Sequence, residues 1–509
     1  MAGGIREWVL NLEPSESVVG DFGRGSRGLK SVGIGIGSAP GLLRNPRIGT
    51  FLAIAVGSIA GVAAALAGPT AGLLIIAGVL ASFAAVSVAV RMPGVLLATY
   101  LLIPFYKGAV QPYAPIDITV LLALLNSLQI IAVVLDRRPR SISRTGIALW
   151  VGVACLVLAG VTYAPDQNVA LIRAANYWGL VFVPLLPAAW RVTSDPRFVR
   201  QFLWTFFGMS ALTVVLGLFL LSSSARLVVL GMDTIQTADA ALLVPIVGIT
   251  FVLRDQSLVL RGATLVLIPA AILVALASGS RGPLLALVAL GALAMIRIIV
   301  RPQSVDWRLA GSVAGLALAS IVLVSLAAAA LPAASTERFS LIGDVLEGGL
   351  SGASDPSGAT RLTLYSLAVS FMEEQPILGV GTSGFQSLSP RFLPALSGVY
   401  PQNALLPFYP HNALLQFGAE YGLVGVVLFV AIVLLALTRR VPRGGPWTAL
   451  QVAFLFFLLE AMISGNILED RMTWGLLLLL LLVDMPRVAQ VPDDLAATPI
   501  GGPARRLAV

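Results

Sequence analysis

Long runs of apolar residues, separated by short polar stretches, recur along almost the entire chain. A helix needs about twenty consecutive apolar residues to cross the roughly 30 Å hydrocarbon core of a bilayer. Fourteen runs meet or approach that length, so the pattern predicts an all-α polytopic membrane protein of about 12–14 transmembrane helices. We place them at residues 48–66, 71–90, 94–106, 116–135, 145–163, 170–190, 199–221, 238–253, 258–277, 282–300, 309–331, 413–437, 447–464 and 472–485.

The apolar pattern stops over one long segment and so divides the chain. Residues 48–331 form an N-terminal transmembrane bundle, residues 332–412 one large loop, and residues 413–487 the last transmembrane helices. The flanking segments, 1–47 and 488–509, lack apolar runs of this length. The first of them mixes arginines with many glycines and serines, which predicts a flexible tail without a removable signal peptide.

Composition agrees with the pattern and excludes several classes of protein. Hydrophobic residues make up 57% of the chain, charged residues make up 11%, and the mean hydropathy is +0.92, whereas soluble domains are roughly 45–50% apolar and 25% charged. The single cysteine, Cys155, lies inside an apolar run and supports neither a disulfide framework nor a cysteine metal site.

The distribution of positive charge orients the helices. Cytoplasmic loops of membrane proteins are enriched in Lys and Arg, and a cytoplasmic N-terminus leaves only eight of the 33 cations on the outer side. The net charge of +8 is therefore a property of the inner loops and does not indicate a nucleic-acid partner. The outer eight are Lys107, Arg173, Arg226, Arg281, Arg338, Arg361, Arg391 and Arg471. This orientation makes residues 332–412 external, and each outer arginine is either functional or extends toward lipid headgroups.

A helix is predicted within this loop. Leu362, Tyr365, Val369 and Met372 recur at helical spacing until Pro376 breaks the pattern. Such a stripe is typical of an amphipathic helix lying on the outer leaflet. A buried helix of a small external lobe would show the same stripe.

The only histidine in the chain, His411, closes this loop. Imidazole is the side chain whose unperturbed pKa suits it to accept and return a proton near neutral pH. A lone histidine can equally well satisfy a loop hydrogen bond. The motifs around His411 favour a catalytic role over a structural one, because His411 belongs to the last of four motifs that follow one another along the chain. The four motifs are Ala277-Ser278-Gly279-Ser280-Arg281-Gly282, Gly358-Ala359-Thr360-Arg361-Leu362, Gln375-Pro376-Ile377-Leu378-Gly379-Val380-Gly381, and Pro410-His411-Asn412 with Gln416, Glu420, Gly422 and Gly425.

In this order, around a long external loop and followed by three membrane spans, the motifs resemble the O-antigen ligase and polymerase family. They cover roughly residues 278–425. The resemblance implies a membrane glycosyltransferase with a helical body of the GT-C type that uses polyprenyl-diphosphate-linked sugars. It implies His411 as the base and Arg281 and Arg361 as ligands of the donor diphosphate. Arg226, in the external loop after the span at 199–221, is a further candidate ligand by position. Glu420, which would hold an arginine, and Asn412 take supporting roles.

The chemistry suits these residue types. A lipid diphosphate leaving group gains negative charge, and the planar guanidinium binds phosphate oxygens in bidentate fashion while remaining protonated. The attacking acceptor hydroxyl needs a proton acceptor, which His411 supplies. We find no carboxylate cluster with metal-ligand character, so we expect neither a metal nor another cofactor. The expected partners are a polyprenyl-diphosphate-linked glycan, a glycan, lipid or protein acceptor, and membrane lipids.

Four other charged residues are not expected to take part in catalysis. Asp117 and Glu460 lie in or near apolar runs, where a charge is costly and often functional. Asp117 is near the outer end of its run, and Glu460 can pair with an arginine or remain protonated. Arg173 and Arg471 can contact phosphate, but extension toward headgroups is the simpler expectation for both.

Several functions remain open from the sequence. A ligase passes finished glycans to a different acceptor and a polymerase adds repeats to another lipid-linked chain, yet both present the same anion to the same cations. We favour a ligase at the outer face of the cytoplasmic (inner) membrane. A flippase for lipid-linked sugars also needs many helices and cations, but the expected paired repeats are not evident here. A peptidoglycan-type polymerase lacks support from its loop signatures.

Overall fold

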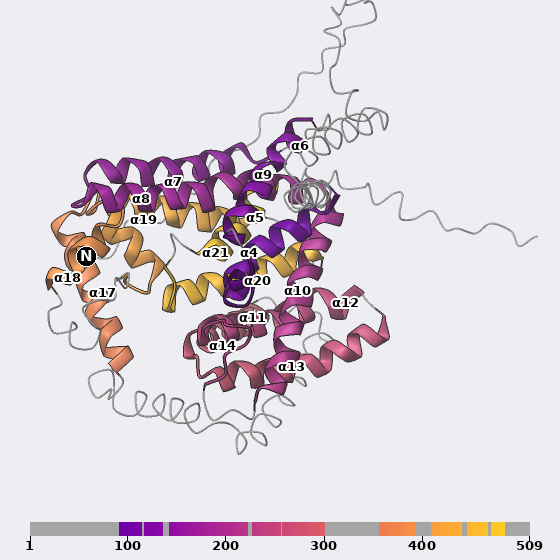
Figure 1. The fold of residues 1–509 in the computed structure, drawn as a ribbon. Helices are drawn as coiled ribbons and strands as arrows, with labels where there is room; N and C mark the ends of the chain where they lie inside the picture. The colour runs from indigo at the N-terminus through magenta and orange to yellow at the C-terminus, as the bar shows by residue number, and fades with distance from the viewer. Residues whose placement is uncertain are drawn as a thin grey trace, which may run out of the picture. The chain divides into compact units, whose positions relative to one another are not determined.

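The computed structural model describes nine segments of the chain, and all of them are helical or connect helices (Figure 1). The described residues are 91–114, 117–135, 142–221, 226–255, 257–300, 356–392, 409–439, 445–466 and 470–483. The predicted spans 48–66, 71–90 and 309–331, the tails 1–47 and 488–509, and much of the predicted loop lie outside these residues.

The other eleven predicted spans are all helical. The all-α membrane fold is confirmed, because eight helices of the described part are long and apolar enough to cross a membrane. They are Pro93–Tyr113, Arg144–Thr162, Gln167–Thr193, Pro196–Phe219, Thr234–Val252, Leu258–Ser278, Ala413–Thr438 and Pro446–Ile463. Three shorter apolar helices account for the remaining predictions, at Ile118–Val134, Arg281–Ile296 and Arg471–Leu482.

Three of the predicted spans are interrupted. Residues 116–135 divide into α5 (Ile118–Ser127) and α6 (Gln129–Leu135). Residues 170–190 comprise α8 (Gln167–Tyr177), a π-helical turn η2 (Trp178–Phe182) and α9 (Val183–Thr193). Residues 238–253 comprise α11 (Thr234–Val247), a second π-helical turn η3 (Gly248–Val252) and the start of α12 (Leu253–Asp255). Hydropathy alone does not reveal these irregular turns, because they leave the apolar run unbroken.

The last helix, α21 (Arg471–Leu482), lies at the centre of the fold. Every residue from Met472 to Leu482 is buried, as expected for a helix that is apolar on all sides. Its Trp474 packs against Trp150 of α7 (Arg144–Thr162) and Phe417 of α19 (Ala413–Thr438), with ring centroids 5.5 and 6.1 Å apart. This aromatic group joins segments more than 300 residues apart.

Helices α4 (Pro93–Val110) and α10 (Pro196–Phe219) begin at the same end of the bundle. A Cβ added to Gly94 would lie 2.0 Å from the carbonyl oxygen of Phe198, so the two backbones touch near their first turns. Arg91 therefore lies at the same end as Arg197 and Arg200, in agreement with their common assignment to one side of the membrane. α10 also packs on α11 and on α13 (Leu258–Ser278).

Helix α19 is broken within its first three turns. Gly422 has φ 59° and ψ −152°, a conformation essentially restricted to glycine. The break leaves carbonyl groups without helical partners, and the segment after α17 (Pro356–Glu374) satisfies them: Val380 and Gly381 donate to the carbonyl oxygens of Ala419 and Glu420, at 2.9 and 2.8 Å.

The same segment also satisfies the freed donors of α19. The amides of Leu423 and Val424 donate to the carbonyl oxygens of Pro376 and Ile377, at 2.8 and 3.3 Å. A Cβ on Gly379 would lie 2.5 Å from the backbone of Glu420. The Gln375–Gly381 motif thus holds the broken helix through backbone hydrogen bonds, and we call this set of bonds the backbone lock.

The helix expected in the external loop exists, but a different face of it is buried. Leu364, Leu367, Ala368 and Phe371 of α17 form a small core with Phe385 of α18 (Gly384–Phe392) and Ala419 of α19. Leu362 and Val369, members of the expected stripe, are exposed by 41% and 42%. The helix carries apolar residues on both faces, so the spacing of one stripe did not reveal which face packs. The structure favours a helix packed into a lobe over one held only by the leaflet surface.

The break in α19 provides a test of this architecture. We expect Gly422→Ala to lower the free energy of unfolding by roughly 2 kcal/mol or more, because its Cβ would meet the Ile377 carbonyl carbon at 2.4 Å in a backbone conformation closed to alanine. The matched control is Gly262→Ala in α13, where a Cβ meets nothing within 4 Å. Thermal melting of the purified proteins measures both, and a Gly422→Ala protein as stable as the control would contradict the lock.

Candidate functional site

His411 lies in the turn that leads into α19, and its backbone is in the left-handed region with φ 53°. Its Nδ1 lies 3.2 Å from the carbonyl oxygen of Ser464, at the end of α20 (Pro446–Ile463). A carbonyl oxygen only accepts, so Nδ1 carries the hydrogen and donates it. Nε2 then holds the lone pair, which is the tautomer that a general base requires.

Asn412 makes this turn rigid. Its Oδ1 accepts from the amide of Leu415 at 3.0 Å, which caps α19, and its Nδ2 donates to the carbonyl oxygen of Met462 at 2.9 Å. One turn later, Gln416 donates to Oδ1 of Asn466 at 3.0 Å. The start of α19 is therefore tied at three points to the end of α20 and the residues that follow it.

Arg281 reaches this region through a tight turn. Gly279 ends α13 in the left-handed conformation, with φ 67°, and Arg281 begins α14 (Arg281–Val300) two residues later. The next residue, Gly282, packs directly on Ser464, since an added Cβ would lie 2.4 Å from the Ser464 Oγ. Ser464 thus touches the Arg281 turn with its side chain and His411 with its backbone.

Arg226 lies against the same turn. Its Nε donates to the carbonyl oxygen of Ser278 at 3.2 Å, and its Nη2 donates to Oγ1 of Thr234 at 2.8 Å. Residue 226 follows α10, whereas Ser278 ends α13. The structure therefore brings Arg226 and Arg281, 55 positions apart in the sequence, to one end of the bundle.

Arg361, near the start of α17, acts electrostatically on His411. Burial lowers the pKa of His411 below its ordinary value, the hydrogen bond to Ser464 raises that pKa, and the positive charge of Arg361 lowers it. Burial is the largest of the three effects, so the environment of the imidazole favours its neutral form. Ser464 thus joins His411 to the Arg281 turn, Arg226 lies against that turn, and Arg361 acts electrostatically on His411.

Glu420 lies on the side of α19 that faces the backbone lock. Its side chain is 3% exposed, and its Oε2 accepts from the amide of Ser383 at 3.1 Å. Glu420 therefore connects the lock to the helix that carries His411 at its start, which fits a supporting role.

A buried acidic cluster was missed from the sequence. Asp239 of α11 is 5% exposed, Glu460 of α20 is 7% exposed, and both interact electrostatically with Asp470, the N-cap of α21. Arg361 acts on Glu460 as well as on His411. The sequence analysis names Glu460 but not Asp239. Its position inside a predicted span was the available signal, because an intramembrane carboxylate is costly and often functional.

Two of the other charged residues have structural explanations. Asp117 caps α5 through the amide of Thr119 and pairs with Lys107 at 2.5 Å. Arg471 lies over the ring of Tyr100, 5.4 Å from its centroid, a cation–π contact. Arg173 lies on α8 with a half-buried side chain. Among the described residues, no three His, Cys, Asp or Glu side chains are grouped so that they could hold a metal ion.

Residues 263–430 match the family model of the O-antigen ligases. The chain carries an O-antigen ligase domain. This confirms the resemblance inferred from the motifs, and it supports a membrane protein of the glycosyltransferase type. The match contains Arg281, Arg361 and His411, whereas Arg226, Asp239, Glu460 and Ser464 lie outside it. No curated protein matches the chain.

Two substitutions separate the contact of Asn412 with the Leu415 amide from its contact with the Met462 carbonyl oxygen. Asn412→Ser keeps an oxygen that can cap α19 but cannot reach Met462, whereas Asn412→Ala loses both contacts. We expect the alanine variant to be less stable by about 1 kcal/mol, which is the usual cost of losing a cap. Both variants should lose turnover, because both release the turn that positions His411. Melting temperature and turnover report the two effects, and a serine variant with full turnover would contradict the positioning role.

Proposed function

We propose that this O-antigen ligase domain protein transfers a glycan from a polyprenyl diphosphate carrier to an acceptor hydroxyl at the outer face of the cytoplasmic membrane. The observation that carries the proposal is the meeting of three arginines and the only histidine around the end of α20. The cations come from three separate parts of the chain, which is expected if they share one multiply charged ligand.

In the proposed reaction, Nε2 of His411 accepts the proton of the acceptor hydroxyl as its oxygen attacks the anomeric carbon. The bond from that carbon to the diphosphate breaks in the same displacement, which inverts the anomeric centre. Arg281, Arg361 and Arg226 stabilise the charge that develops on the departing diphosphate. No metal is needed in this scheme, because guanidinium groups do the work often given to a divalent cation.

The supporting residues fit the same scheme. The carbonyl of Ser464 orients the imidazole, and Asn412 holds the turn in which it lies. The acidic cluster of Asp239, Glu460 and Asp470 lies within electrostatic range of Arg361 through Glu460.

Incubation of the purified protein with a lipid-linked glycan and an acceptor tests the proposal. We expect His411→Ala to lower turnover by roughly 10²–10⁴-fold, which is the usual contribution of a general base, and we expect the wild-type reaction to continue in a metal chelator. Arg173→Gln is the matched control, because Arg173 is an outer arginine that we place outside the donor site. Unchanged turnover in His411→Ala would remove the base assignment.

Mass analysis of the products decides between related activities. Single-step conjugates to a different acceptor identify a ligase, which we favour, whereas a ladder of repeats identifies a polymerase. Movement of the lipid-linked glycan across liposomes without use of acceptor would identify a flippase.

The pH profile provides an independent test of the geometry. Because Arg361 lowers the pKa of His411, Arg361→Gln should raise that pKa, and the acid limb of the kcat/KM profile should move to higher pH. Arg281→Gln is the control: it removes a donor cation as well, but Arg281 is not among the groups that shift the His411 pKa. A limb that moves equally in both variants, or to lower pH in Arg361→Gln, would contradict the arrangement.

A further inference from the structure

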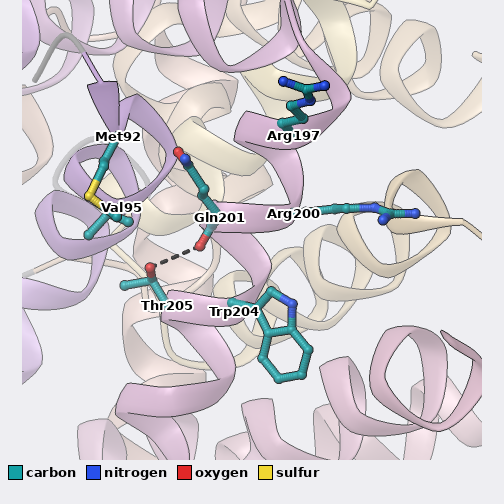
Figure 2. Close-up of a pocket in the computed structure, with 7 residues that line it drawn as sticks. All are labelled: Met92, Val95, Arg197, Arg200, Gln201, Trp204 and Thr205. Atoms are coloured by element: carbon teal, nitrogen blue, oxygen red, sulfur yellow. Dashed lines mark hydrogen bonds between the residues drawn. The ribbon is translucent and has the colours of Figure 1, made fainter. Parts of the chain in front are cut away.

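A groove of about 460 Å³ lies where α4 and α10 begin, and the proposed reaction does not use it. It is lined by Met92, Val95, Arg197, Arg200, Gln201, Trp204 and Thr205. Figure 2 shows Met92 and Val95 on one side of Gln201 and Thr205, with Arg197, Arg200 and Trp204 on the other. The groove therefore combines an apolar wall from α4 with a basic and aromatic wall from α10.

The groove lies at the opposite end of the bundle from the candidate site. α10 has 24 residues, and at 1.5 Å per residue its length is roughly 36 Å, which is enough to cross the hydrocarbon core. Arg197 and Arg200 lie in its first turns, whereas Arg226 follows its last. A ligand of this groove would not be the glycan donor bound near His411.

The charge of this end is strongly positive. Arg91 directly precedes the groove residue Met92, and Arg191 lies over the ring of Phe198, 5.0 Å from its centroid. Asp195 is the acidic residue beside the groove, and its Oδ1 accepts from the amide of Arg197 as the N-cap of α10. Arg197 and Arg200 are both exposed, so their guanidinium groups are accessible to an anion.

Apolar lining and accessible cations together indicate a lipid. Tryptophan prefers the boundary between headgroups and acyl chains, and Trp204 lies two turns from the start of α10. Basic pockets between transmembrane helices bind anionic headgroups.

We propose that this groove is a binding site for an anionic phospholipid of the leaflet opposite to the reaction. The phosphate lies between Arg197 and Arg200, and one acyl chain packs along Met92, Val95 and Trp204. The lipid would fasten the first turns of α4 and α10 together, where Gly94 already allows their backbones to touch.

Native mass spectrometry of the full-length protein tests the site with two lipids that share acyl chains, dioleoyl phosphatidylglycerol and dioleoyl phosphatidylcholine. We expect wild-type protein to retain the anionic lipid preferentially. The double variant Arg197→Gln/Arg200→Gln should lose roughly thirty-fold in affinity for it, on the basis of two headgroup cations. Arg144→Gln, which removes an exposed arginine at the start of α7, should bind as the wild type does.

Three outcomes would overturn the proposal. One is equal retention of the two lipids by the wild type, and another is an equal loss in Arg144→Gln. The third is a double variant that melts at a lower temperature in lipid-free detergent, which would mean that the protein itself fills the groove. A second variant, Val95→Phe, occupies the apolar wall while leaving both arginines in place. It should weaken retention of phosphatidylglycerol, and inorganic phosphate should not compete if the acyl chain contributes.

Discussion

The attachment of the start of α19 to the end of α20 is the constraint on which the candidate site depends. Three hydrogen bonds make it, from His411 to the carbonyl oxygen of Ser464, from Asn412 to that of Met462, and from Gln416 to Asn466. They hold a non-glycine residue in the left-handed region, a conformation that costs free energy unless its surroundings impose it. The imidazole is thereby given one orientation and one tautomer.

The helix that carries this turn is itself shaped by backbone contacts. The break at Gly422 removes helical hydrogen bonds from a buried part of α19, and buried backbone groups without partners are costly. The segment from Pro376 to Gly381 replaces those bonds with its own carbonyl and amide groups. The loop between the two groups of membrane helices is thus connected to α19 by its backbone, and its helix α17 carries Arg361, which acts electrostatically on His411.

Arginine and acidic residues occupy separate places around the attached ends of α19 and α20. Arg226 and the Arg281 turn lie together at one end of the bundle, whereas the carboxyl groups of Asp239 and Glu460 are buried within the helices. Neither set is a typical component of an apolar interior. The apolar core around Trp474 keeps the helices together.

The sequence by itself determined the membrane class, the position of the eleven predicted spans that the structure describes, and the candidate site residues, whose roles remain predictions. Apolar runs, a single histidine and arginines on the less basic side are properties of residue type, which the chain displays directly. Tertiary structure alone decided the rest. The backbone lock at Gly422, the buried face of α17, and the contacts of Ser464 with Gly282 and His411 depend on which segments meet. The groups that make those contacts are largely main-chain atoms and small side chains, and no pattern of hydrophobic and polar residues distinguishes them.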